Sequence, residues 1–172
     1  MKTRQLFILR HAKSDWAENS LDDVNRPLSN RGETDAPRIG QWMLTNQFKP
    51  ETIISSPALR AKQTVQAISQ VLALTPNQLT FDKRLYLADL QHLLEVISQC
   101  PPTITRLLIA GHNPGLETLL RYLCPAPLPL TNDGQLFTTA NLAVVSLSQP
   151  WDHDLQGHGE LLQLIRPRDL DT

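Results

Sequence analysis

Short apolar runs alternate along this chain with longer segments of helical periodicity, and no other feature of the sequence constrains its fold as strongly. The clearest run is Leu6-Phe7-Ile8-Leu9, which is typical of a buried parallel strand. Strands are predicted at residues 5–10, 52–55, 79–82, 106–110, 143–147 and 160–165, and helices at residues 31–48, 57–72, 89–99 and 114–123.

This order of elements predicts an α/β fold. We expect a three-layer α/β/α sandwich with a mostly parallel central sheet and an antiparallel edge strand. A length of 172 residues suits a single domain over residues 1–172. Pro37 is expected to limit how the first helix begins, and Ser56-Pro57 to cap and open the second. Residues 11–30 read as a long loop, and loops of that length are usually functional.

Composition excludes some classes of partner. The chain has 16 basic and 17 acidic residues, so its net charge of −1 gives no reason to expect binding to nucleic acid or to a membrane. No apolar stretch approaches the length of a transmembrane helix, and no signal peptide is recognised at the N-terminus. Cys100 and Cys124 lack metal or redox spacing and are predicted to be free thiols, which favours a cytoplasmic location.

Polar residues that can bind a ligand or take part in catalysis follow three of the predicted strands. Arg10-His11 ends the first strand, Ser55-Ser56-Pro57 with Arg60 one turn later follows the second, and Gly111-His112 follows a third. Ligands of open α/β sheets bind beyond the carboxyl ends of the strands. Two arginines and two histidines are therefore expected to meet at one edge of the sheet, in a site that suits a phosphoryl group.

Each of these residue types has a role in phosphoryl transfer. A neutral imidazole such as that of His11 attacks phosphorus through one ring nitrogen when the other donates its proton to a fixed acceptor. The planar guanidinium groups of Arg10 and Arg60 would bind the phosphoryl oxygens. His112 would donate to those oxygens and stabilise the transition state. The N-terminus of the helix near Pro57 would add its dipole.

The motifs also carry a family resemblance. The strand followed by Arg10-His11-Ala12-Lys13-Ser14 resembles the signature of the histidine phosphatase (phosphoglycerate mutase-like) superfamily. Residues 10–16 together with Asp23, Arg26-Pro27-Leu28 and Arg31-Gly32 resemble, more narrowly, the small SixA-like phosphohistidine phosphatases. Ser55-Ser56-Pro57 through Gln63-Thr64 matches the second motif of the family, and Gly111-His112-Asn113-Pro114 matches the third.

The resemblance implies a phosphoglycerate mutase-like fold and a phosphohistidine intermediate on His11, with no metal and no other cofactor. It implies Arg10 and Arg60 as phosphate ligands and His112 as the second catalytic histidine. Asn113 is a further candidate substrate ligand, and Arg26 either contacts substrate or anchors the loop. The expected partner is a phosphate-bearing substrate, with a phosphohistidine phosphotransfer protein as one candidate. The oligomeric state is left open.

Two departures from the family pattern concern the chemistry. Ala12 stands where many members have glycine, and residues 85–88 offer no glutamate to act as general acid. Asp23 is the candidate proton donor, although it could instead orient Arg26. Phosphohistidine has a labile P–N bond, so it would reduce the need for such an acid.

Several rival functions stay open at this point. A small phosphomonoester or phosphoamino acid could replace phosphohistidine as substrate. A phosphoglycerate mutase is a second possibility, although residues 71–106 leave little length for the capping segments that mutases use. A catalytically silent phosphate-binding module is a third. His153 and His158 stand near acidic residues, but their spacing matches no standard metal motif, so they are expected at a solvated turn.

Overall fold

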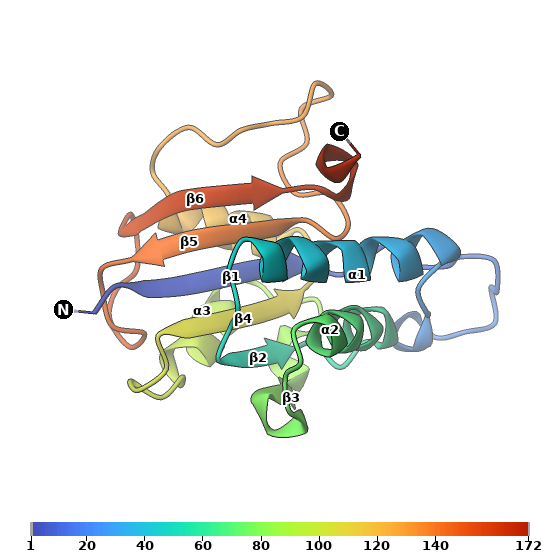
Figure 1. Cartoon of the computed structure of the whole chain (residues 1–172), viewed down its shortest axis with the longest axis horizontal. Coiled ribbons are helices and arrows are strands. Elements are labelled where there is room, and N and C mark those ends of the chain that lie inside the picture. Colours follow the sequence, from blue (N-terminus) through green and yellow to red (C-terminus); the bar gives the residue numbers. More distant parts are fainter. Residues whose placement is uncertain (1, 172) are drawn as a thin grey trace.

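One six-stranded sheet forms the middle layer of the molecule (Figure 1). The structure is a computed structural model and describes residues 2–171. The strand order is β3-β2-β4-β1-β5-β6. The strands are β1 (Arg4–Arg10), β2 (Thr52–Ser55), β3 (Leu79–Phe81), β4 (Arg106–Gly111), β5 (Leu142–Leu147) and β6 (Gly159–Ile165). All six predicted strands are confirmed within a few residues.

The sheet is mostly parallel, as predicted. β1 pairs in parallel with β4, and β2 pairs in parallel with both β4 and β3. β5 is antiparallel to its two neighbours, β1 and β6. The antiparallel strand therefore lies one place inside the edge, and β6 forms the edge itself.

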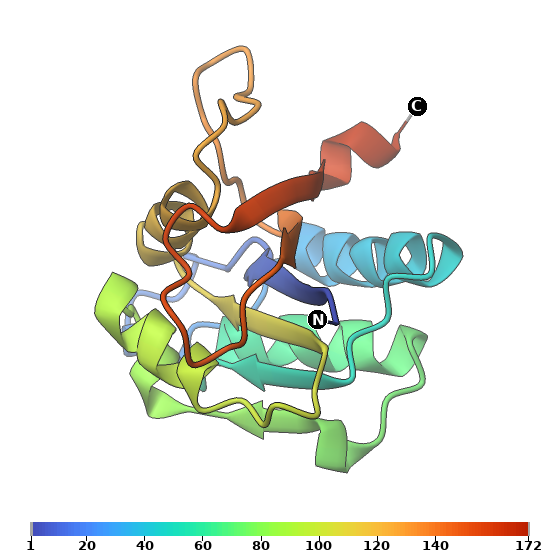
Figure 2. The same cartoon turned by 90° about the vertical axis from the view of Figure 1, so that its left-hand side faces the viewer.

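Two helices cover each face of the sheet, which completes the three-layer sandwich (Figure 2). The helices are α1 (Asn30–Thr45), α2 (Leu59–Val71), α3 (Leu90–Ser98) and α4 (Gly115–Leu123). α1 and α2 pack on one face, and α3 and α4 pack on the other. Figure 2 also shows that the loop between α4 and β5 projects away from the layers.

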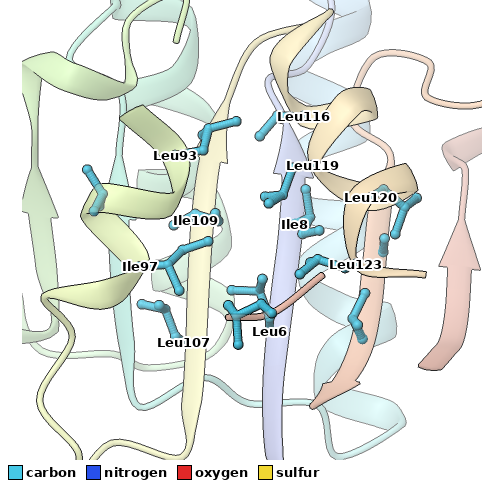
Figure 3. Close-up of a cluster of buried hydrophobic side chains, with 14 of the residues drawn as sticks. Leu6, Ile8, Leu93, Ile97, Leu107, Ile109, Leu116, Leu119, Leu120 and Leu123 are labelled. Carbon is cyan, nitrogen blue, oxygen red and sulfur yellow. The ribbon is translucent and has the colours of Figure 1, made fainter. Parts of the chain in front are cut away.

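The central strand β1 supplies side chains to both hydrophobic layers, because successive residues of a strand point to opposite faces. Leu6 and Ile8 pack with the leucines of α3 and α4 (Figure 3). Phe7 and Leu9 belong to the layer beneath α1 and α2. All four are fully buried, so β1 is fixed firmly on both sides just before the polar pair that ends it.

The predicted start of α2 is wrong, and so is the role expected of Pro37 in α1, although α1 itself begins within one residue of its predicted start. α2 begins at Leu59, so Pro57 is not its first residue, and the Oγ atom of Ser56 accepts a hydrogen bond from the Ala58 N–H in the preceding turn. Pro37 lies inside α1 and does not limit its start. The helix begins earlier because Ser29 caps it, with its Oγ atom accepting from the Gly32 N–H at 3.2 Å.

The segment before β6 folds locally. His153 contacts Asp152 at 2.9 Å, and the indole N–H of the buried Trp151 donates to the Ile104 carbonyl. Among residues 2–171, no helix is both long and apolar enough to cross a membrane.

Gly115, the first residue of α4, allows a very close approach of two backbone segments. A Cβ atom there would overlap the carbonyl oxygen of Ala88. We expect Gly115→Ala to lower the free energy of unfolding by about 2–3 kcal/mol, because the overlapping atom belongs to the backbone and cannot rotate away. Urea denaturation would measure this.

The matched control is Gly111→Ala, in which the new Cβ would lie 3.4 Å from the Leu85 carbonyl oxygen, an ordinary contact. Its unfolding free energy should change by less than about 1 kcal/mol. Equal losses in the two variants would contradict the overlap at Gly115.

Candidate active site

The carboxyl ends of β2, β4 and β1 lie side by side and bring the predicted residues together. The backbone ladder continues past the strands, since the His11 N–H donates to the Gly111 carbonyl at 3.1 Å and the Ser56 N–H to the Ala110 carbonyl at 2.9 Å. The rings of His11 and His112 consequently lie 5.2 Å apart between centroids. The predicted meeting of the strand ends is confirmed.

The hydrogen bond made by His11 defines its tautomer. Its Nδ1 atom lies 2.7 Å from the Ala12 carbonyl oxygen, which can only accept, so Nδ1 carries the proton. Burial, together with the positive charges of Arg60, Arg10 and Arg26, lowers the pKa of His11 to about 4. At neutral pH the ring is uncharged, and its Nε2 atom holds a lone pair.

His112 lies between a hydroxyl group and a guanidinium group. Its Nε2 atom is 2.7 Å from the Ser56 Oγ atom, and its Nδ1 atom is 3.4 Å from the Arg60 Nη2 atom. Since Arg60 can only donate, Nδ1 accepts and Nε2 holds the proton that Ser56 receives. Burial and the nearby His11 and Arg60 lower the pKa of His112 to about 3. A dianion at this position would favour protonation of Nδ1 and would then receive a proton or hydrogen bond from it.

The predicted arginines are held in the same site. Arg60 is only 3 % exposed and donates from Nη1 to the Asp23 carbonyl at 2.7 Å. Arg10 donates from Nη1 to the Phe137 carbonyl at 2.8 Å, and its burial lowers its pKa. The Nε atoms of both side chains lack a hydrogen-bond partner among the described residues. Their positive charge is therefore only partly compensated.

Asp23 binds two arginines and a tyrosine. Its carboxylate accepts from Arg60 at 3.0 Å, from Arg26 at 2.8 Å and from the hydroxyl group of Tyr86. The hydrogen bond from Tyr86, reinforced by Arg60, lowers the pKa of Asp23. An ionised carboxylate in this setting suits the positioning of arginines better than the donation of a proton.

Arg26 anchors the loop, which is one of the two roles considered for it. It is anchored to the loop by Asp23, and its guanidinium carbon lies 3.4 Å from the centroid of the Trp16 ring. Its positive charge also contributes to the lowered pKa of His11. The contact with Asp23 therefore holds this charge close to His11.

Three residues of the site were missed by sequence reasoning. The sequence pattern predicts a helix cap at Ser56 and assigns no role to Tyr86. Tyr86 also packs edge-on against His112, with centroids 5.5 Å apart. Thr64, within the second motif, accepts from the Ala12 N–H and donates to the Arg60 carbonyl, which ties the first motif to α2.

Asn113 lines a pocket together with Arg10. Its Nδ2 atom donates to the same Phe137 carbonyl that Arg10 uses, at 2.8 Å. Arg10, Asn113 and Phe137 line an open pocket of about 620 Å³, so this pocket shares Arg10 with the candidate site, whereas His11, His112 and Arg60 are not among its lining residues. Within residues 2–171, the His, Cys, Asp and Glu side chains form no group of three suited to a metal ion.

The pKa values of the histidines give the protein a stability that depends on pH. Between pH 6.5 and about 4 the unfolded chain binds a proton at His11 that the folded chain excludes, so stability falls as the pH is lowered through this range. We expect the protonation of His11 in the unfolded chain to lower the free energy of unfolding by about 2 kcal/mol at pH 5 relative to neutral pH. Thermal unfolding at pH 7 and pH 5 would measure the difference.

The variant His11→Gln should show a smaller loss between these two pH values, because it has no imidazole to protonate. His92→Gln, which changes an exposed histidine on α3, should behave as the wild type does. A wild-type melting temperature that is equal or higher at pH 5 would contradict this prediction.

A family model, that of the histidine phosphatase superfamily (branch 1), matches residues 6–86. The phosphohistidine phosphatase SixA of Escherichia coli is 30% identical over 152 residues, with 84% of this chain and 86% of SixA covered. An uncharacterised chloroplastic protein of Arabidopsis thaliana is 32% identical over 167 residues, with coverage of 90% of this chain and 77% of that protein.

Solved structures agree with these sequence matches. The protein histidine phosphatase SixA complexed with tungstate superposes with a TM-score of 0.79 and 25% identity, and the match covers 97% of this chain and 99% of that one. A mycobacterial glucosyl-3-phosphoglycerate phosphatase has the same fold, with a TM-score of 0.66 at 16% identity and coverage of 94% and 98%.

Proposed function

Because this chain belongs to the histidine phosphatase superfamily and is SixA-like, we propose that it hydrolyses phosphohistidine through a covalent intermediate on His11. Phosphatase activity follows from the family. The identity of the intermediate and the choice of phosphohistidine as substrate are the parts that we add.

The observation that carries the proposal is the hydrogen bond from His11 Nδ1 to the Ala12 carbonyl. It fixes the neutral tautomer whose Nε2 lone pair can form a bond to phosphorus. Burial, with a contribution from the surrounding arginines, keeps the ring uncharged, and the arginines supply positive charge for the equatorial oxygens of the phosphoryl group.

The reaction would proceed in two steps. In the first, Nε2 of His11 forms a bond to phosphorus while the bond to the leaving group breaks, and Arg10, Arg60 and His112 stabilise the charge on the oxygens. In the second, water attacks the phosphorylated His11, which releases inorganic phosphate and restores the neutral imidazole. The chain's own groups supply the nucleophile and the positive charge for both steps.

The ionised state of Asp23 supports phosphohistidine as the substrate. Neither Asp23 nor the neutral residues 85–88 provide a carboxylic acid at neutral pH. A poor leaving group such as an alkoxide needs a proton donor, whereas an imidazole leaves readily and can take its proton from water. The similarity to SixA, whose name describes a phosphohistidine phosphatase, points in the same direction.

We also propose that residues 1–172 act as a single catalytic domain on a phosphate-bearing substrate, with no nucleic-acid or membrane partner. A cytoplasmic location remains a prediction. It is supported by Cys100 and Cys124, which are free and buried, and whose pKa values burial raises to about 11. Such thiols are inert and suit a reducing compartment.

Hydrolysis of two substrates would test this function. Phosphohistidine and an aryl phosphate whose ring carries no further charge are each incubated with the purified protein in the presence of a metal chelator. We expect phosphohistidine to be hydrolysed with the higher kcat/KM. Preference for the aryl phosphate would overturn the substrate, and loss of activity on chelation would overturn the metal-independent mechanism. A protein that binds inorganic phosphate but hydrolyses neither substrate would be a silent phosphate-binding module.

A further inference from the structure

A basic pocket adjoins the phosphoryl site on the side of Arg10 and Asn113. It has a volume of about 620 Å³ and is open to solvent. Its walls are formed by four parts of the chain: the end of β1 and the loop after it with the first turn of α1, residues 113–117, residues 134–139, and residues 167–168. Apart from Arg10 and Asn113, none of these residues has a role in the proposed reaction.

The charged residues that line the pocket are mostly basic, unlike those of the protein as a whole. Arg10, Lys13, Arg31 and Arg168 face a single acid, Glu117, although the whole chain carries a net charge of −1. Glu117 is itself paired with Arg121 at 3.3 Å. A bound phosphoryl group would use the charge of Arg10 and leave the other cations of the pocket available.

Lys13, in the first motif, and Arg31, at the start of α1, lie on backbone segments that pack closely together. The Lys13 carbonyl accepts from both the backbone N–H and the hydroxyl group of Ser29, at 2.9 and 3.0 Å. Gly32 approaches so closely that a Cβ atom there would overlap this carbonyl oxygen. Arg31 precedes Gly32 and pairs only loosely with Asp35, at 3.4 Å.

The third cation, Arg168, is also attached to fixed structure. The Pro167 carbonyl accepts from Arg38 of α1 at 3.2 Å, and Arg166 donates to the carbonyls of Pro129 and Leu136. The charge of Arg168 contributes to the lowered pKa of Asp133, which results chiefly from a hydrogen bond with Thr131. Neither Lys13 nor Arg168 forms an ion pair with an acid of residues 2–171.

We propose that this pocket is a subsite for a second anionic group of the substrate, bound by Lys13, Arg31 and Arg168 while the phosphoryl group lies at Arg10 and His11. The inference rests on the proposed phosphatase function and adds a selectivity to it. An open, polar pocket with several cations and one acid favours an anionic ligand through its positive potential, and the backbone that carries these cations is held in place by hydrogen bonds and close contacts. The anion is a carboxylate or phosphate on the leaving-group side, carried either by a small metabolite or by acidic residues that flank a phosphohistidine.

Two matched pairs of substrates would test the subsite and separate these sources. The small pair is 4-carboxyphenyl phosphate and 4-carbamoylphenyl phosphate, which differ in charge but have similar leaving groups. The peptide pair consists of phosphohistidine peptides with glutamate or glutamine on either side. In the wild type we expect the anionic member of at least one pair to have a kcat/KM about tenfold higher at low salt. Discrimination in the small pair alone indicates a metabolite, and discrimination in the peptide pair indicates a protein.

The double variant Lys13→Gln/Arg168→Gln should lose this preference. It should still hydrolyse the carbamoyl substrate and the glutamine peptide, which lack the second anionic group. Lys49→Gln/Lys83→Gln removes the same charge at exposed positions outside the pocket and should keep the preference. Equal kcat/KM values for both members of both pairs in the wild type would overturn the subsite and leave the phosphatase function intact. A preference that survives in the pocket variant would also overturn it. A wild type inactive on all four substrates would instead contradict the proposed function.

Discussion

His11→Asn is expected to lower kcat by about 10⁴-fold or more, because it removes the only nitrogen lone pair that the mechanism uses. The asparagine amide can still donate to the Ala12 carbonyl, so the backbone of the first motif should keep its shape. Steady-state hydrolysis of phosphohistidine would measure the loss. Rapid acid or alkali quenching of wild type and variant with a labelled substrate would measure the intermediate.

The wild type should accumulate a label that survives alkali and is lost in acid, as expected for a phosphorus–nitrogen bond, and the variant should accumulate none. Binding of inorganic phosphate by the variant would show that the rest of the site is intact. His92→Asn, on the exposed face of α3, is the matched control and should turn over normally. Near-normal turnover by His11→Asn would refute the central claim.

Arg60→Ala is expected to lower kcat/KM by about 10³-fold. The side chain of Arg60 is almost completely buried and contacts His112. It donates hydrogen bonds to the backbone carbonyl and to the carboxylate of Asp23. Its removal takes away phosphoryl charge stabilisation and releases the loop that holds Arg26. Kinetics with phosphohistidine would measure the effect.

The more conservative Arg60→Lys keeps the charge but loses the planar fork, and we expect it to cost about 10²-fold. Arg84→Ala removes an arginine that is paired with an aspartate elsewhere, at 2.7 Å from Asp82, and should leave kcat/KM unchanged. Thermal unfolding of each variant would separate lost catalysis from lost folding. Less than a tenfold effect in a folded Arg60→Ala protein would exclude Arg60 from the phosphoryl site.

Much of the fold could be predicted from the sequence because buried parallel strands leave a strong local signal. β1 and β4 are nearly uninterrupted apolar runs, and each is followed at once by its polar residues. That arrangement was enough to predict that His11 and His112 would meet. The start of α2 was mispredicted because a serine followed by proline favours a helix start locally, whereas in the fold Ser56 is bound to His112.

The remaining site residues depend on contacts that local sequence does not encode. Tyr86 reaches Asp23 across a long separation in the chain, and no spacing rule links a tyrosine to that carboxylate. Arg10 and Asn113 both donate to the backbone carbonyl of Phe137. Every residue has such a carbonyl, so the residue type does not indicate which one is used. Sequence could therefore identify the candidate catalytic groups and Asp23, but not the other residues that hold them in place.

The position of β1 in the sheet has a consequence for the order in which the protein is made. β1 precedes the other strands and helices in the sequence, yet it completes its pairing only when Arg4 meets Leu147 of β5, far along the chain. His11, Arg60 and His112 all precede the last two strands, so a nascent chain carries every reacting group before it has the strand that closes one side of β1. Contacts between such distant segments form late in folding. The growing polypeptide thus carries His11, Arg60 and His112 before it carries β5, the strand that completes the pairing of β1.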